Sequence, residues 1–216
     1  MTFEKEKESG LKQSIKDKNI MLAEVHHRVK NNLQIINSLI SLKSRKIEDQ
    51  YTLDIIKEIE NRIKSMGLIH EQLYQQETFS TIDIQKYVKA ITSQIKGSFM
   101  DKNIKFEIDV HSYLLDLDTL TPLGLLITEI ITNSLKYAFP NGQVGVIKID
   151  LREFETTNYK LVISDNGIGF DLNNHNGGVI GMELIQGLVM QLGGTHEIES
   201  DNGTKISVIF PIPLKN

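Results

Sequence analysis

The sequence predicts an α+β protein in two parts, a helical hairpin over residues 1–79 and an α/β sandwich over residues 80–216. Between Phe3 and Gln76 there is no proline, and apolar residues recur at helical spacing. Beyond about residue 80, strand-like runs alternate with helical segments. This order is typical of one mixed sheet with helices on one face.

Two long helices account for the first part. The apolar stripe of the first runs from Leu22 to Ile40, that of the second runs from Leu53 to Leu73, and residues 46–50 hold the turn. Two antiparallel helices leave part of such a long stripe uncovered. We therefore expect the hairpin to pair with a second copy into a four-helix bundle, which makes the chain a homodimer.

Local signals place the elements of the second part. Aspartate is a favourable N-cap, proline is tolerated in the first turn of a helix, and Asn-Gly favours tight turns between strands. With the apolar periodicity, these signals predict a helix from Asp83 to about Gly97, a strand over residues 104–110, a helix starting at Thr121-Pro122, strands over residues 144–151 and 159–164, a helix from about Gly181 to Leu192, and a hairpin of residues 195–199 and 205–210.

The composition excludes several classes of protein. Among 216 residues, 40% are hydrophobic and 24% charged, which suits one or two domains with a real core. The formal net charge of -4 gives no basic field for nucleic acid, and zero cysteines exclude disulfides and thiolate metal sites. No apolar run reaches the roughly 18 residues of a membrane span, and the polar start is no signal peptide. We expect a cytoplasmic protein without direct membrane insertion.

A first candidate site follows a predicted strand, where residues 165–169 read Asp-Asn-Gly-Ile-Gly. Taken alone, this segment is equally typical of an ordinary turn. A buried carboxylate at Asp165 would accept a hydrogen bond from the amino group of adenine. Gly167 and Gly169 would let the base approach the backbone, because they carry no side chain.

A second segment lies upstream, on the apolar helix that is expected after Pro122. Glu129, Asn133 and Lys136 are spaced four and three residues apart, so they share one helical face. A solvated polar stripe has the same spacing, but the mostly apolar neighbours favour a buried helix. An amide oxygen at Asn133 suits magnesium, Glu129 can hold or activate a water, and Lys136 can meet a phosphate. Together the two segments predict a magnesium-nucleotide site, with the metal at Asn133 and Glu129.

Two further stretches border this predicted site. Gly177-Gly178 and Gly181 precede a helix, so the free amides at its start can face a phosphate; a flexible surface loop has the same sequence. Thr204, after Gly203, can add a hydroxyl from the last strand.

These segments resemble a known family. The boxes that carry the likeness are Asn133 with Lys136-Tyr137, Asp165-x-Gly-x-Gly169, and Gly181 before its helix. They are similar to the adenine-nucleotide boxes of the GHKL ATPases, which include histidine kinases, a family of heat-shock chaperones, mismatch-repair ATPases and type II topoisomerases. The resemblance implies a GHKL-type sandwich that binds ATP with Mg²⁺.

The helical part narrows the resemblance. The segment Glu24-Val-His-His27-Arg-Val-Lys-Asn31-Asn-Leu-Gln resembles the phosphoacceptor helix of the sensor histidine kinase subfamily related to the HWE kinases. The resemblance covers about residues 15–213, with four boxes in the family's order. It implies a protein that phosphorylates its own histidine from ATP and then passes the phosphoryl group to an aspartate on a response regulator receiver domain. An upstream sensory domain, in a longer protein or in a separate one, is also implied.

Either of two adjacent histidines can be the acceptor. At about 100° per residue, His27 lies roughly 155° from the centre of the apolar stripe and His26 only about 55° from it. His27 therefore points outward, and in the family the acceptor is the histidine directly before arginine. His26 is then a packing or supporting residue.

Two neighbours of His27 are further candidates, because Glu24 and Asn31 lie within its side-chain reach. Commoner histidine kinases have an acidic residue after the acceptor, whereas here Arg28 follows, so Glu24 is our hypothesis for the group that orients or deprotonates His27. Asn31 resembles the position that aligns a water for dephosphorylation of the regulator. A phosphatase activity is therefore included in the prediction.

Two other functions remain open at the level of sequence. One is a GHKL ATPase or clamp that hydrolyses ATP without phosphohistidine, which the lack of a large downstream domain disfavours. The other is a noncatalytic phosphotransfer or scaffold dimer, which the intact boxes disfavour.

Overall fold

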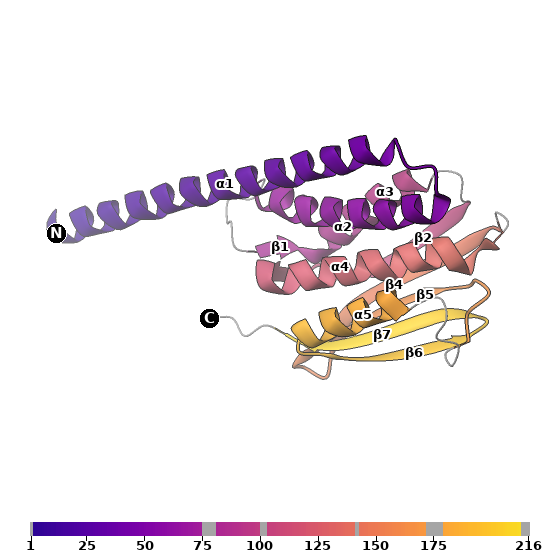
Figure 1. Cartoon of the computed structure of the whole chain (residues 1–216). Coiled ribbons are helices and arrows are strands. Elements are labelled where there is room, and N and C mark those ends of the chain that lie inside the picture. The colour runs from indigo at the N-terminus through magenta and orange to yellow at the C-terminus, as the bar shows by residue number, and fades with distance from the viewer. Residues whose placement is uncertain (1, 75–80, 100–102, 141–142, 172–178, 213–216) are drawn as a thin grey trace.

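The computed structural model describes residues 2–74, 81–99, 103–140, 143–171 and 179–212. Two long helices, α1 (Thr2–Ser44) and α2 (Gln50–Tyr74), form the predicted hairpin. The Asp49 carboxylate accepts a hydrogen bond from the Thr52 amide at 2.8 Å and so caps the start of α2. Figure 1 shows the helices side by side, with the N-terminal half of α1 projecting beyond the rest of the chain.

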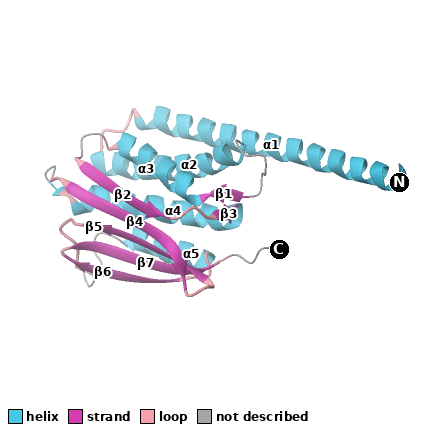
Figure 2. Ribbon diagram, turned by 180° about the vertical axis from the view of Figure 1, so that it is seen from behind, coloured by secondary structure: helices cyan, strands magenta, loops and turns pink. Residues whose placement is uncertain are grey.

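A five-stranded mixed sheet with helices on one face forms the second part, as predicted. The sheet order is β2-β4-β5-β7-β6; β2 and β4 are parallel, and the other neighbours are antiparallel. Figure 2 shows the helices behind the sheet. The strands are β2 (Ile104–Val110), β4 (Gly145–Phe154), β5 (Asn158–Asp165), β6 (Thr195–Asp201) and β7 (Gly203–Pro211), and the helices are α3 (Ile84–Ser98), α4 (Leu117–Asn133) and α5 (Val179–Gln191).

Two features of the fold were not predicted. The short strands β1 (Thr81–Asp83) and β3 (Leu114–Asp116) pair with each other as a separate antiparallel ribbon. A π-helical turn, η1 (Ser134–Ala138), continues directly from α4. Three-residue strands are too short to show a periodicity, and a π turn has no sequence signature of its own.

The start of α4 differs from the prediction. We expected the helix to begin at Thr121-Pro122, but it begins one turn earlier, at Leu117. The Asp116 carboxylate caps it by accepting a hydrogen bond from the Thr119 amide at 2.9 Å. Pro122 is tolerated inside the helix because it lies close enough to the start that only the carbonyl of the exposed Asp118 loses a helical donor.

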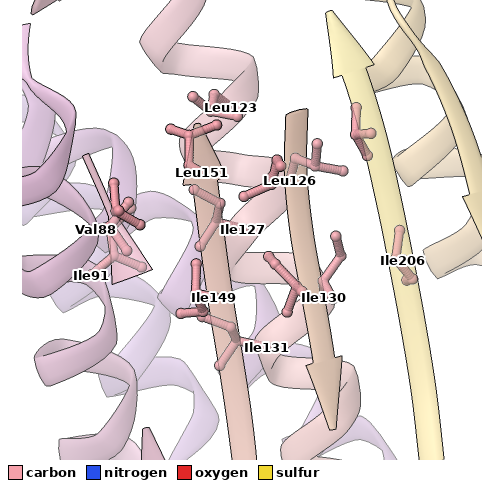
Figure 3. Packing of buried hydrophobic residues seen from close by; sticks show 14 of the residues in the cluster. Val88, Ile91, Leu123, Leu126, Ile127, Ile130, Ile131, Ile149, Leu151 and Ile206 are labelled. Atoms are coloured by element: carbon pink, nitrogen blue, oxygen red, sulfur yellow. The ribbon is translucent and has the colours of Figure 1, made fainter. Parts of the chain in front are cut away.

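The hydrophobic core is centred on α4. Figure 3 shows its apolar residues between α3 on one side and the strands β4 and β7 on the other. All of the residues labelled there are at most 5% exposed. They are Val88, Ile91, Leu123, Leu126, Ile127, Ile130, Ile131, Ile149, Leu151 and Ile206. Because both sides of α4 are packed, its C-terminal end and η1 are held in a fixed place over the sheet.

Within the part of the chain that the structure describes, each helix is too short or too polar to cross a membrane.

We expect Leu126→Ala to lower the free energy of unfolding by about 2–5 kcal/mol, since the fully buried side chain leaves a cavity in a packed core. Leu114→Ala is the matched control, because Leu114 is 64% exposed, and it should change stability by no more than about 0.5 kcal/mol. Urea unfolding followed by circular dichroism measures both. Equal losses in the two variants would contradict the central place of α4.

Candidate active site

Asp165 ends β5 and is held by three hydrogen bonds. Its Oδ1 accepts from the backbone amides of Gly167 at 3.0 Å and Thr204 at 3.2 Å, and its Oδ2 accepts from the Ser134 hydroxyl at 2.7 Å. The side chain is therefore both buried and fixed in direction. Thr204 contributes its backbone amide here, whereas we predicted a contribution from its hydroxyl. Ser134 was missed, although it stands directly after Asn133 in the segment that we singled out.

The glycines after β5 are required by close backbone contacts. A Cβ atom at Gly167 would lie 2.3 Å from the carbonyl oxygen of Ala138, and the Ile168 amide donates to that same oxygen at 3.0 Å. Gly169 has a φ of +65°, and a Cβ there would lie 2.7 Å from the Asp201 carbonyl oxygen. The loop is thus pressed between η1 and the β6–β7 turn. It directly follows Asp165, which we predicted to accept a hydrogen bond from adenine.

Glu129 is buried on α4 and paired with an arginine of α2. Its side chain is 4% exposed, and its Oε2 accepts from Arg62 Nε at 3.0 Å and Nη2 at 2.6 Å. Burial raises the pKa of the Glu129 carboxyl, while the charge and hydrogen bonds of Arg62 and a hydrogen bond from Asn133 oppose this rise. Arg62 thereby offsets part of the effect of burial on this carboxyl.

Lys136 lies on η1, where it too is engaged by α2. Its Nζ forms an ion pair with the Glu58 carboxylate and donates to the Asp54 carbonyl oxygen at 3.2 Å. Its neighbour Tyr137 is 60% exposed. π turns occur frequently at functional sites, and this one shifts Lys136 relative to the α-helical face on which we had placed it.

Glu58 and Arg62 could not be identified as candidate site residues from the sequence. Arg62 lies 67 positions before Glu129, and Glu58 lies 78 positions before Lys136. The resemblance singled out no residue of this second helix, so the packing of α2 against α4 alone reveals their role.

Gly181 was expected just before a helix, and this detail is wrong. The helix α5 begins at Val179, so Gly181 lies inside its first turn. A Cβ at Gly181 would lie 3.0 Å from Glu129 Oε1 and 3.2 Å from Asn133 Nδ2. The glycine therefore lets α5 approach the polar face of α4 closely. Gly178, also predicted to border the nucleotide, lies outside the described residues.

The side-chain oxygen atoms of Glu129 and Asn133 suit a cation whose remaining ligands do not come from the protein. Glu129 Oε1 and Asn133 Oδ1 both face Gly181, the latter 3.8 Å from the position of a Cβ there. Among the described residues, no group of three or more histidine, aspartate or glutamate side chains is placed to hold a metal ion. Magnesium commonly binds one or two protein oxygens and completes its shell with phosphates and waters. The donor set fits metal bound with a nucleotide.

His27 is exposed on α1, as the helical geometry predicted. The amide nitrogen of Asn31 lies 3.3 Å from His27 Nδ1, so the predicted reach of Asn31 is confirmed. Glu24 instead pairs with Arg28, whose Nη2 lies 2.5 Å from Glu24 Oε1. The carboxylate that we proposed to orient His27 is therefore engaged by the next residue along the helix.

His26 faces the interior of the hairpin and is 7% exposed. Its Nδ1 lies 3.0 Å from His70 Nδ1 on α2, which requires one ring to donate and the other to accept. Burial lowers the pKa of both histidines, and the charge of His26 lowers that of His70 further. The pair therefore favours neutral rings directly beside the exposed His27.

The helix α2 stands between the histidine and the nucleotide-site residues. Figure 1 shows α1, α2 and α4 stacked in this order, and Figure 2 shows the same order from behind. His27 lies on α1, whereas Glu129, Asn133 and Lys136 lie on α4 and η1. The structure thus brings the residues that we predicted for the nucleotide site together but leaves His27 on a separate layer.

Two family models match the chain. The first, described as histidine kinase, matches residues 24–99. The second, described as histidine kinase-, DNA gyrase B-, and HSP90-like ATPase, matches residues 119–214. Together they include the segments of both His27 and the nucleotide site.

Relatives and solved structures agree with these matches. Blue-light-activated histidine kinase 2 of Erythrobacter litoralis is 27% identical over 202 residues, 89% of this chain and 57% of that protein. Sensor histidine kinase PdtaS of Mycolicibacterium smegmatis is 26% identical over 210 residues, 93% of this chain and 41% of that protein. The structure of the Erythrobacter litoralis EL346 blue-light-activated histidine kinase has a TM-score of 0.67 at 25% identity, covering 88% of this chain and 58% of that one. This chain therefore spans about half the length of the curated relatives.

The fold and the two matched regions define a class of protein in which a phosphoacceptor helical region precedes an ATP-binding domain. The chain belongs to the histidine kinases, so the predicted resemblance is confirmed.

We expect the free energy of unfolding to fall as the pH drops below about 6.5, because the unfolded chain binds protons at His26 and His70 before the folded chain does. The stabilising contribution is present above about pH 6.5 and is lost as the pH falls through the lowered folded-state pKa values. Urea unfolding between about pH 7.5 and pH 5 measures it. His70→Phe should flatten this dependence, whereas His111→Phe, at an exposed histidine, should not. The same slope in His70→Phe and wild type would disprove the role of the pair.

Proposed function

We propose that the chain is the catalytic core of a two-component sensor histidine kinase. It would phosphorylate His27 from ATP with Mg²⁺ and pass the phosphoryl group to an aspartate of a response regulator receiver domain. One combination of features carries the proposal. His27 is exposed and directly precedes Arg28, and in the same chain a buried Asp165 accepts three hydrogen bonds beside the Asn133–Lys136 segment.

The proposed roles in the nucleotide site follow from the contacts. Asp165, already oriented by Ser134, would accept a hydrogen bond from the exocyclic amino group of adenine. Gly167 and Thr204 would border the base, because their backbone amides contact Asp165, and Gly169 would do so from the same loop as Gly167. We further assign Tyr137, Gly178 and Gly181 to the border of the same nucleotide.

The charged residues would act on the triphosphate. ATP with Mg²⁺ supplies the phosphoryl group and neutralises part of its charge. Asn133 and Glu129 are the proposed metal ligands, directly or through water, and Lys136 would hold the phosphates. His27 would attack the γ-phosphorus through a ring nitrogen, so that an N–P bond forms while the bond to the β-phosphate oxygen breaks and ADP leaves. Asn31 would hold the imidazole of His27 during phosphoryl transfer. In the predicted phosphatase activity, Asn31 would instead place a water for dephosphorylation of the regulator.

The layered arrangement implies a movement. Because α2 lies between His27 and the nucleotide-site residues, the ATP-binding part must change its position relative to the hairpin before transfer. We propose a boundary between the two parts at residues 79 and 80, next to the start of β1 at Thr81. Residues 1–79 then form the dimerisation and phosphotransfer part and residues 80–216 the catalytic part.

Dimerisation through the hairpin is part of the proposal. Several large apolar side chains of α1 and α2 are more than a third exposed, and three of them, Val25, Ile36 and Ile59, belong to the predicted stripes. A second copy of the chain carries the same exposed apolar residues and can cover them. The residues are Ile20, Met21, Val25, Ile35, Ile36, Leu39, Leu42, Ile55 and Ile59.

A sensory domain, upstream or separate, and a cytoplasmic location complete the proposal. The cysteine-free composition suits a reducing compartment.

The test of the kinase proposal uses γ-labelled ATP and magnesium. We expect protein-bound label that is acid-labile and base-stable in wild type and absent in His27→Gln, because the acceptor nitrogen is lost. His111→Gln, at another exposed histidine, should be labelled like wild type. If the label persists in His27→Gln but disappears in His26→Gln, the acceptor is His26 and not His27. Released phosphate without label would instead identify a clamp-like ATPase, and neither product would identify a scaffold.

The dimer is tested by sedimentation velocity. We expect Leu39→Glu to shift the chain from dimer to monomer, because Leu39 is 56% exposed within the apolar stripe and a charge there cannot be buried cheaply. Leu114→Glu is the control, since Leu114 is 64% exposed but lies on β3, outside the hairpin. A monomeric wild type, or a dimeric Leu39→Glu variant, would contradict the proposed interface.

A further inference from the structure

We propose that Glu58 of α2 is a built-in competitor of the nucleotide phosphates for Lys136. In this structure Glu58 forms an ion pair with Lys136 and so holds α2 against η1. We call this ion pair the α2 lock; nucleotide binding and the α2 lock exclude each other. The inference rests on the proposed function, because it assumes that Lys136 meets the phosphates. It adds an autoinhibitory contact within the same site.

The first support is the state of Lys136 itself. Its side chain is only 14% exposed, and that of its ion-pair partner Glu58 is 21% exposed. The Asp54 carbonyl oxygen, 3.2 Å away, is a second acceptor for the same ammonium group. A phosphate that approaches Lys136 must therefore take over a position that α2 already holds.

The second support is the order of charges across the interface. Arg62 Nη2 lies 3.9 Å from Glu58 Oε2 and 2.6 Å from Glu129 Oε2. The row thus reads Lys136, Glu58, Arg62, Glu129, with charges of alternating sign. A triphosphate placed at Lys136 would bring negative charge next to the Glu58 carboxylate, in a region where screening by water is weak. Repulsion would then favour withdrawal of α2.

The third support is the position of the lock in the fold. The same helix that carries Glu58 lies between α1, with His27, and α4. Release of Lys136 from Glu58 would therefore make the lysine accessible to phosphate and remove one of the contacts that hold α2 in place. Since coupling between two binding events is reciprocal, whatever strengthens the α2 contact must weaken nucleotide binding by the same factor.

Glu58→Gln is the sharpest variant because it removes the competing charge and leaves the pair of Arg62 with Glu129 in place. A substitution of Arg62 is less informative, since it would leave Glu129 buried without its cation. Glu71→Gln is the matched control. Glu71 lies on the same helix and also pairs with a lysine, Lys30 at 3.0 Å, but this pair is on the α1 side of the helix.

The first experiment is calorimetric titration with a non-hydrolysable ATP analogue and magnesium. We expect Glu58→Gln to bind at least about fivefold more tightly than wild type, the lower end of typical coupling between sites. Glu71→Gln should bind like wild type. In a Lys136→Met background, Glu58→Gln should no longer tighten binding, because the lysine for which Glu58 competes is absent. Glu58→Ala serves as a second variant, and thermal melting checks that each protein is folded.

The second experiment follows the lock directly. The chain has no cysteine, so spin labels on Lys57→Cys in α2 and Glu197→Cys in β6, both exposed positions, are unambiguous. The analogue should change the distance distribution between the labels in wild type. Glu58→Gln should show that change without nucleotide.

The outcomes separate the two levels of the proposal. If wild type binds no nucleotide, the proposed function fails. If wild type binds and Glu58→Gln binds equally or more weakly, only the lock fails, and Glu58 is then a structural contact or a support for the nucleotide. An unchanged label distance on binding would also overturn the lock.

Discussion

The burial of α4 on two sides is the constraint on which the rest of the structure depends. Its apolar residues pack between α3 and the sheet, while its polar side faces α2 and the start of α5. A helix in this position cannot move without losing core packing, which costs several kcal/mol for each large side chain. The residues at its end, Asn133 and those of η1, are therefore held at fixed positions over the end of β5.

This fixed frame explains how polar groups can be kept ready inside the protein. Asp165 is oriented by Ser134 from η1 and by two backbone amides, that of Gly167 in the loop after β5 and that of Thr204 in β7. Burial raises the pKa of the Glu129 carboxyl, and Arg62 of another helix opposes this rise by supplying the opposite charge. Both carboxylates thus depend on groups that tertiary structure brings to them, which links the chemistry of the site directly to the packing of α4.

The same dependence makes the position of α2 a point of control. An ionic contact between layers is weaker and more easily exchanged than an apolar core, because a competing ion can replace either partner. The pairs of Glu58 with Lys136 and of Arg62 with Glu129 form the ionic part of the contact of α2 with α4 and η1, beside the buried Ile69, and we propose that a charged ligand displaces this ionic part. The apolar packing of α4 on the sheet would remain intact during such an exchange.

The sequence by itself determined the order of the elements, the exposed side of His27 and the segments around Asn133 and Asp165, since periodicity, capping residues and glycine-containing turns are local properties. It placed the start of α4 one turn too late, because the Asp116 cap outweighed the signal of Pro122. It placed Glu24 within reach of His27, and the structure adds that Arg28 also pairs with Glu24. Only the tertiary structure decided that Glu58, Arg62 and Ser134 belong to the site and that His26 meets His70. These contacts join residues on separate elements, up to 78 positions apart, and no local pattern encodes which helix faces will meet.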